Sequence, residues 1–172
     1  MSNINLNGEL REQVIRLAQR VAGDPRLVTM VMRWNEDNNL IWTIDSLPNG
    51  QTEVPGGGAA HSEEVMIQCW TELLVQAGGA QPRIVEIALS KSPCLDRSPE
   101  RQYKGTWWPC GCSSKLEALI NVVEPTVEEW RIAFCNYYQE GIRIGAQAFG
   151  AIGSLQGIPK VDCYRLWDRQ TL

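Results

Sequence analysis

The sequence lacks the long apolar run that a protein needs in order to cross a membrane. Its longest uncharged apolar stretch is well short of the roughly 20 residues required for a spanning helix. Residues 1–7 contain neither a basic segment nor an apolar segment, so we expect no signal peptide. These absences predict a cytoplasmic protein without a membrane partner.

An excess of positive charge is also missing. Lysine and arginine together number 16 against 20 acidic residues, which gives a formal net charge of −4. This balance disfavours a protein that coats nucleic acid through a general positive field, but it does not exclude a local basic groove. With 44% hydrophobic and 21% charged residues, the chain has enough apolar material for a core and is not intrinsically disordered. At this length we expect residues 1–172 to form a single domain.

Histidine is the scarcest of the residues that bind metals, because His61 is the only one in the chain. The six cysteines occur without a secretion signal, and we therefore interpret them first as reduced thiols or metal ligands. Cys69, Cys135 and Cys163 lie inside predicted helices or strands, where they most simply fill the core.

Periodicity and turn residues predict alternating helices and strands. Helices are expected over 8–22, 61–76, 113–125 and 141–155, and strands over 27–34, 40–45, 83–89, 130–138 and 161–167. Loops are expected over 47–60 and 90–111. Strands that alternate with helices predict an α/β sandwich in which helices cover the sheet. The helix between the last two strands permits a parallel crossover there.

Potential metal ligands stand at three boundaries of consecutive elements. His61 opens the second predicted helix, Cys94 follows the third predicted strand, and Cys110 and Cys112 precede the next helix. One imidazole and two thiolates suit Zn²⁺ and leave a fourth position for water, whose pKa the metal lowers to about 7. Glu63, two residues after His61, is then placed to move protons between that water and a substrate.

These residues also have an ordinary structural interpretation. A lone histidine beside an apolar helix is usually structural, and a buried Cys94 or Cys112 can simply be a small core residue. The conjunction of His-x-Glu at a helix start, Pro-Cys after a strand and Cys before the next helix favours the metal site.

The motif H-x-E…P-C-x-x-C is the signature of zinc-dependent deaminases. His61-Ser62-Glu63 resembles its first half. The run Ser90-Lys91-Ser92-Pro93-Cys94 resembles the S-W-S-P-C of AID/APOBEC-type polynucleotide cytosine deaminases and is also similar to bacterial toxin-type deaminases. The order of elements over residues 8–168 resembles the AID/APOBEC-like branch of the cytidine deaminase superfamily. The resemblance implies a three-layer α/β/α sandwich with a five-stranded mixed sheet whose last two strands are parallel.

The chain departs from this signature at one position. Arg97, not cysteine, stands three residues after Cys94, so the second sulfur must come from across the insertion 95–111. Some bacterial toxin-type deaminases look similar, with this cysteine displaced to just before a helix that contains Lys-Leu. Cys112 fits that description, and we expect it to bind Zn²⁺ together with His61 and Cys94. Cys110 is the alternative third ligand.

Several residues are predicted to contact the substrate. The resemblance implies that Glu63 carries out the proton transfers, that backbone groups of Ala60 and Ser92 meet the base, and that Tyr138 or Tyr137 stacks on it. Tyr137 has the alternative of packing in the sheet. The insertion combines cations and aromatic rings that suit a single nucleic-acid strand, namely Arg97, Arg101, Lys104, Trp107 and Trp108. Alternatively, the two tryptophans pack the insertion onto the domain and its cations are solvated. Gly56–Gly58 would let backbone approach the substrate closely.

The sequence thus predicts zinc-dependent deamination of cytosine to uracil in DNA, single- or double-stranded, by a domain of bacterial toxin type. RNA or a free nucleoside is the first alternative substrate. A non-catalytic binding module with a structural zinc is the second alternative. The toxin resemblance further implies a cognate immunity protein and export through a specialised secretion system into the cytoplasm of a target cell.

Overall fold

The computed structural model describes residues 2–46, 60–138 and 144–172. Its helices are α1 (Gly8–Gly23), α2 (Ser62–Gln68), α3 (Trp70–Gln76), α4 (Cys112–Ala118), α5 (Ile144–Gln156) and α6 (Leu166–Arg169), and a π-helical turn η1 (Leu119–Val123) continues α4. Its strands are β1 (Thr29–Trp34), β2 (Ile41–Asp45), β3 (Ile84–Lys91), β4 (Arg101–Tyr103), β5 (Thr106–Trp108), β6 (Glu129–Asn136) and β7 (Val161–Arg165). None of the helices within these ranges is long and apolar enough to cross a bilayer. The predicted loop up to residue 59, with Gly56–Gly58, and residues 141–143 of the last predicted helix lie outside the described residues.

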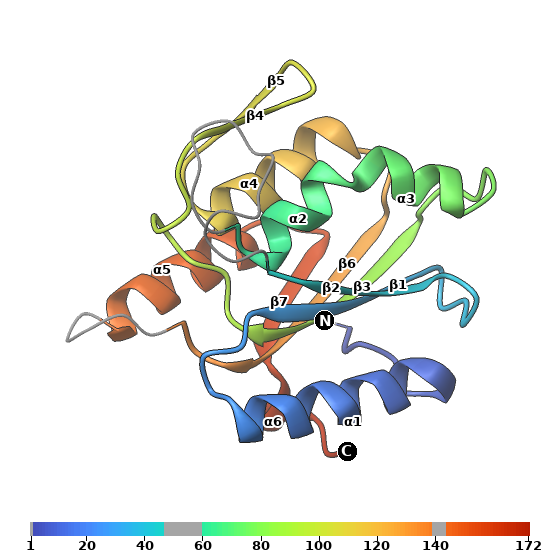
Figure 1. Ribbon diagram of the computed structural model, residues 1–172, viewed down its shortest axis with the longest axis vertical. Coiled ribbons are helices and arrows are strands. Elements are labelled where there is room, and N and C mark those ends of the chain that lie inside the picture. Colours follow the sequence, from blue (N-terminus) through green and yellow to red (C-terminus); the bar gives the residue numbers. More distant parts are fainter. Residues whose placement is uncertain (1, 47–59, 139–143) are drawn as a thin grey trace.

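Five strands form one mixed sheet in the order β2-β1-β3-β6-β7 (Figure 1). β1 runs antiparallel to β2 and β3, whereas β3, β6 and β7 run parallel. α4 lies between β3 and β6 along the chain and α5 between β6 and β7, which provides the crossovers that parallel pairs require. The prediction of a five-stranded mixed sheet with its last two strands parallel is confirmed. Because β3 and β6 end at the same edge, the segments that follow them are neighbours, and Lys91 pairs with Asn136.

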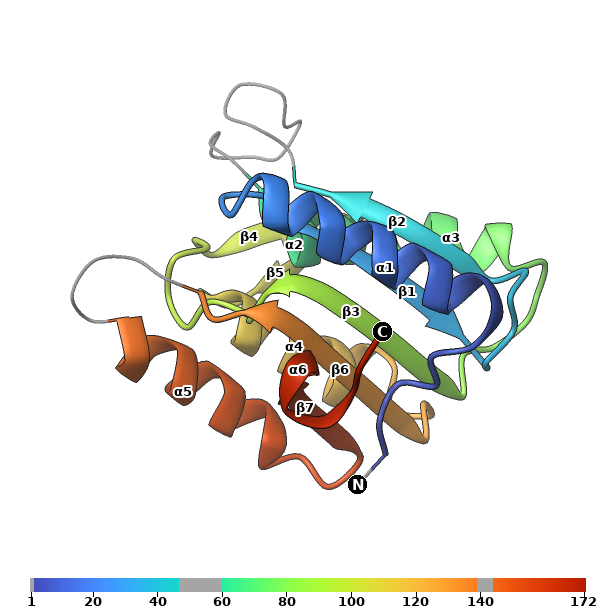
Figure 2. The same ribbon diagram turned by 90° about the horizontal axis from the view of Figure 1, so that it is seen from below.

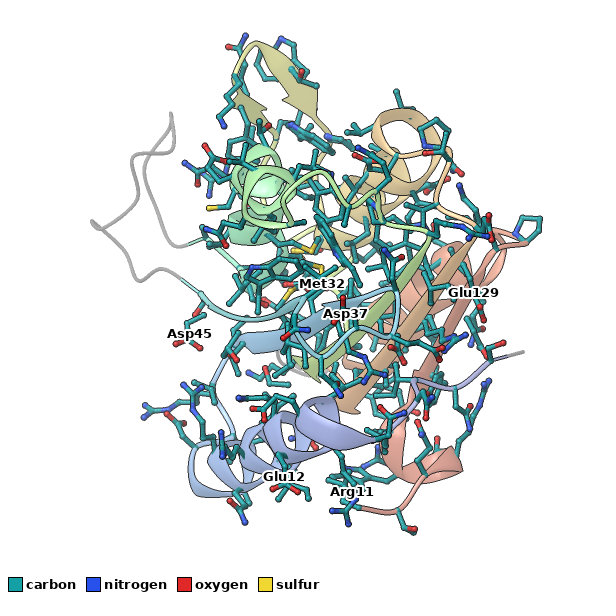
Figure 3. All side chains as sticks on the ribbon, turned by 90° about the vertical axis from the view of Figure 1, so that its right-hand side faces the viewer. Arg11, Glu12, Met32, Asp37, Asp45 and Glu129 are labelled. Atoms are coloured by element: carbon teal, nitrogen blue, oxygen red, sulfur yellow. The ribbon has the colours of Figure 1, made fainter. Side chains whose placement is uncertain are left out.

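Helices cover both faces of the sheet, which confirms the predicted α/β/α layers. α1 and α6 lie on one face (Figure 2), and α2, α3 and α4 lie on the other. The strand period of two separates the cores: Val31 of β1 packs under α1, while Met30 and Met32 belong to the opposite core. Figure 3 shows Met32 between the sheet and that second layer, and Arg11 and Glu12 on the outer side of α1.

The predicted helix 61–76 is two helices that meet at Cys69. This residue has a φ of −91° and a ψ of 4°, outside the regular helical values. Its carbonyl still accepts the N–H of Leu73 at 3.0 Å, so backbone hydrogen bonding continues through the break. Cys69 is only half-buried at this point, whereas Cys135 and Cys163 are buried in the core as predicted.

The insertion predicted as a loop contains the β4–β5 hairpin. Lys104 and Gly105 at its tip have φ values of 48° and 82°, which are the left-handed values of a two-residue type I′ turn. Elsewhere the differences are at element ends. The predicted strands 130–138 and 161–167 stop at Asn136 and Arg165, so Tyr137 and Tyr138 lie beyond the end of β6.

Candidate metal centre

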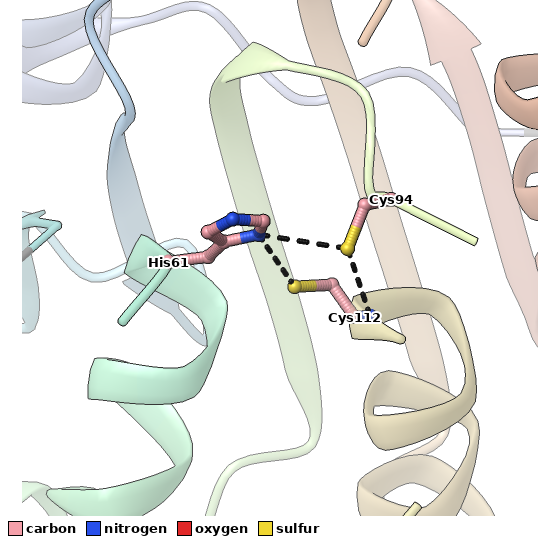
Figure 4. A group of neighbouring side chains, drawn as sticks. All are labelled: His61, Cys94 and Cys112. Carbon is pink, nitrogen blue, oxygen red and sulfur yellow. Dashed lines mark hydrogen bonds between the residues drawn. The ribbon is translucent and has the colours of Figure 1, made fainter. Parts of the chain in front are cut away.

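The structure brings one histidine and two cysteines together at the carboxyl end of β3 (Figure 4). His61 caps the N-terminus of α2, Cys94 lies just after β3, and Cys112 is the first residue of α4. One ligand atom from each lies within 4.8 Å of the others. Three elements that are distant in sequence therefore deliver the donor set that the motifs predict.

The distances in this cluster match a tetrahedral metal site. Nδ1 of His61 lies 3.2 Å from Sγ of Cys112 and 3.5 Å from Sγ of Cys94. Tetrahedral Zn²⁺, with bonds of about 2.1 Å to nitrogen and 2.3 Å to sulfur, would separate these atoms by about 3.5 Å. Cys110, the alternative ligand, is exposed, and its thiol donates to the carbonyl of Asp96 at 3.3 Å. The geometry thus selects Cys112.

Polar contacts favour the thiolate form of Cys94. The backbone N–H of Cys112 donates to Sγ of Cys94 at 3.3 Å, and the N–H of Ser113 donates to the Cys94 carbonyl at 3.0 Å. A hydrogen bond from Cys112, with a second from His61, lowers the pKa of Cys94 to about 4. Burial raises the pKa of the Cys112 thiol. Without metal, the pair therefore holds one thiolate and one thiol, and binding of a metal through both sulfurs releases the second proton.

Glu63 is buried beside this cluster, with 3% of its surface exposed. Burial raises the pKa of its carboxyl to about 7, although the charge of His61 opposes this change and the thiolate of Cys94 adds to it. The hydroxyl of Ser62 donates to Oε2 of Glu63 at 3.1 Å and fixes the orientation of the carboxyl. A carboxyl that titrates near neutrality can both accept and donate a proton.

Ala60, Ser92 and Tyr138 border the cluster. Ala60 precedes His61 and is fully buried. The hydroxyl of Ser92 accepts the backbone N–H of Tyr138 at 2.7 Å, and the Tyr138 ring lies 5.7 Å from the His61 ring. The ring of Tyr137 packs against Phe134 in the sheet, which was the predicted alternative to stacking on the base.

Fewer of the predicted substrate-binding residues in the insertion 95–111 are exposed than the sequence predicts. Trp107 is 67% exposed, whereas Trp108 is buried against Tyr103. Arg97 lies on the surface near a neighbouring carboxylate, and Lys104 binds a carboxylate of α3 at 2.6 Å. The prediction that Arg101 is a strand-binding cation is wrong, because its side chain is buried.

Sequence reasoning missed two residues that support the cluster. Glu64 binds Arg101, with Nε to Oε2 at 2.9 Å, and Lys115 is fully buried near the same carboxylate. A glutamate three residues after a helix cap is a capping-box signal, and Oε1 of Glu64 does accept the N–H of His61 at 3.1 Å. That local pattern could have identified Glu64, but not its distant partners.

Among the described residues, the cluster consists of three ligands and no fourth His, Cys, Asp or Glu. Three protein ligands are typical of catalytic zinc sites, whereas structural sites use four. Comparisons of the chain with models of protein families, with curated proteins and with solved structures gave no match.

Gly111 provides a test of how tightly this site is built. Its φ is 86°, and a Cβ added to it would lie 1.8 Å from the carbonyl oxygen of Leu95. We expect Gly111→Ala to destabilise the fold by more than the roughly 1–3 kcal/mol of backbone strain alone and to weaken zinc binding. Gly105→Ala is the matched control, since its φ is 82° and its Cβ would meet nothing within 4 Å. Urea unfolding and chelator competition measure both effects; equal zinc affinities in the two variants would contradict this view.

The raised pKa of Glu63 predicts a pH-dependent cost to stability in metal-free protein. The fold favours the neutral form of this carboxyl, whose pKa is about 7 in the fold and 4.5 in a solvated chain. The stabilisation that protonated Glu63 gives to the fold is therefore fully present below about pH 4.5 and is lost as the pH rises through about 7. Glu63→Gln removes this dependence. We expect its unfolding free energy, relative to the unmodified chain, to increase by up to about 3 kcal/mol between about pH 5 and pH 8. Parallel stability profiles for the two proteins would exclude a buried Glu63 with this pKa.

Proposed function

We propose that this protein is a zinc-dependent deaminase that hydrolyses cytosine to uracil in DNA. The observation that carries the proposal is the convergence of His61, Cys94 and Cys112 beside the buried carboxyl of Glu63. These residue types, in this chain order, resemble the zinc deaminase signature, with the second cysteine displaced across the insertion. His61, Cys94 and Cys112 would hold the metal, and Glu63 would not bind it.

The reaction adds water at C4 of cytosine and releases ammonia. A zinc ion held here supplies a Lewis acid that lowers the pKa of water to about 7. Glu63 would accept a first proton from the attacking water and deliver it to N3 of the base, and would then accept the second proton from the hydroxyl added at C4 and deliver it to the departing amino group, which leaves as ammonia. Burial, which raises the pKa of this carboxyl to about 7 in the chain without metal, favours a group that can both accept and donate a proton. Ser62 keeps the carboxyl oriented during these steps.

The residues around Glu63 support a planar base as the substrate. Tyr138 places an aromatic ring next to the His61 ring, and Ser92 fixes the backbone of Tyr138. Stacking of a base on such a ring contributes about 1–3 kcal/mol. Ala60 adds only a methyl group beside His61. We assign these three residues to binding of the base.

A cationic pocket near the same edge supports a substrate with phosphates. This pocket of about 390 Å³ lies at the carboxyl ends of β3, β6 and β7. Its lining residues are Pro25, Arg26, Lys91, Asn136, Tyr137 and Arg165. Among them are three cations and no carboxylate, although Asp24 binds Arg26 at 3.3 Å. Lys91 and Tyr137 are the chain neighbours of Ser92 and Tyr138, which supports a substrate that reaches from the cluster to this pocket.

Two alternatives are less well supported. A structural zinc module requires a fourth ligand, and Cys110, the nearest cysteine in sequence, points to the carbonyl of Asp96. A free nucleoside would leave the cationic pocket without a role. DNA is preferred to RNA because of the resemblance to toxin-type deaminases, and the same resemblance is the basis for proposing an immunity protein and export into a target cell.

Glu63→Gln tests the reaction. We expect deamination to fall by at least about 10²-fold while the zinc content is unchanged, because the substitution removes the proton carrier and leaves the ligands intact. Glu72→Gln, at an exposed carboxylate of α3, is the control and should keep full activity. Base conversion is measured by sequencing of matched single-stranded and duplex DNA and RNA. Activity of Glu63→Gln equal to that of the control contradicts the mechanism, and ammonia release from cytidine alone supports the nucleoside alternative.

Lys91→Gln tests the phosphate pocket. We expect weaker binding of a short single-stranded DNA and a salt dependence whose slope is smaller by about 0.7, the value for one lost phosphate contact. Lys160→Gln changes the net charge equally but lies before β7, at the opposite edge of the sheet, and should bind like the unmodified chain. Affinity is measured by fluorescence anisotropy at several salt concentrations. Equal losses in both variants would mean that the pocket has no specific role.

A further inference from the structure

The interrupted motif creates a structural problem that one group of buried charges solves. In C-x-x-C, a single helical turn fixes the distance between the two sulfurs, but here the insertion 95–111 separates Cys94 from Cys112. A long insertion between two ligands would allow their sulfurs to move apart unless other contacts hold its ends. The fold must therefore supply those contacts.

Lys115 of α4 holds the two ends of the insertion together. It lies one helical turn after Cys112, and its ammonium donates to the hydroxyl of Ser98 and to the carbonyl of Pro99, the latter at 2.7 Å. The carbonyl of Ser98 in turn accepts the N–H of Gly111 at 2.7 Å. These bonds join the segment just after Cys94 to the segment that carries Cys112.

Glu64 connects the insertion to the histidine ligand. Its Oε1 accepts the backbone N–H of His61 at 3.1 Å. Its Oε2 accepts Nε of Arg101 at 2.9 Å and the hydroxyl of Tyr103 at 3.3 Å, both from β4, and lies 4.0 Å from Nζ of Lys115. One carboxylate thus contacts α2, the insertion and α4, the three segments that deliver or separate the metal ligands.

Burial of these charges argues for a positioning role. Glu64 and Lys115 are fully buried and Arg101 is 2% exposed. A buried ion pair is often no more stabilising than apolar residues of similar volume, and its clearest attested use is to specify one arrangement. We propose that Glu64, Arg101 and Lys115 form an ionic clasp that takes over the role of the C-x-x-C turn and sets the affinity and geometry of the metal centre. All three are positioning residues, since none supplies a ligand atom.

The experiment measures metal binding, because the inference rests on the metal part of the proposed function and not on base conversion. The double variant Glu64→Gln/Arg101→Met removes both members of the closest pair, and Lys115 keeps its hydrogen bonds to Ser98 and Pro99. We expect its zinc affinity, from chelator competition, to fall about 10- to 100-fold, as for other residues that orient metal ligands. We also expect its Co²⁺-loaded form to lose the strong absorption of tetrahedral sulfur coordination.

Two further variants keep the test decisive. Arg83→Met/Glu128→Gln removes an exposed pair of the same chemistry, whose atoms lie 2.9 Å apart, and should leave zinc affinity and the Co²⁺ spectrum unchanged. Glu64→Asp keeps the charge but shortens the carboxylate arm. It should fold even if the double variant does not, and it should still lose zinc affinity. Unaltered zinc affinity in either folded clasp variant overturns the inference. An unmodified chain that binds no zinc overturns both the clasp and the proposed function, whereas a zinc-binding chain without deaminase activity overturns only the latter.

Discussion

The structure depends on the approach of one imidazole nitrogen and two sulfurs to within 4.8 Å of one another. The thiolate of Cys94, the carboxyl of Glu63 and the ionic group around Glu64 are all buried in the same region. Burial of charge is unfavourable unless it is paired or coordinated. A metal ion would account for the convergence of the imidazole and the two sulfurs, whereas Glu64 is already paired with Arg101.

The parallel strands position this set. Because β3 and β6 end at the same edge, Ser92 and Cys94 lie beside Tyr138, and α2 and α4 begin against that edge from one face of the sheet. Ligand sites at the carboxyl ends of parallel strands are common in α/β sheets, since loops there converge while the strands hold them rigidly. The cationic pocket lies at the same edge, so a net charge of −4 coexists with a local group of three cations.

The fold and the ligands could be predicted because their signals are local. Alternation of apolar residues identified the five main strands, and His61, Glu63 and Cys94 occur in short motifs. The sequence favoured Cys112 over Cys110 only through a resemblance, since the two cysteines flank Gly111 and differ by two positions. Arg101 was assigned to a nucleic-acid surface because cations interleaved with aromatic residues suit a single strand. Its partner Glu64 is distant in sequence, and only the folded chain shows that the two are paired.

X-ray absorption spectroscopy of the purified, unmodified protein tests the central claim most directly. The measurement counts the metal and identifies its ligand atoms without relying on activity. Our account predicts one zinc ion per chain with one nitrogen from imidazole, two sulfurs and one further light atom, at about 2.0–2.1 Å and 2.3 Å for nitrogen and sulfur respectively. Protein without zinc, or zinc bound by three or four sulfurs, would contradict a centre built from His61, Cys94 and Cys112.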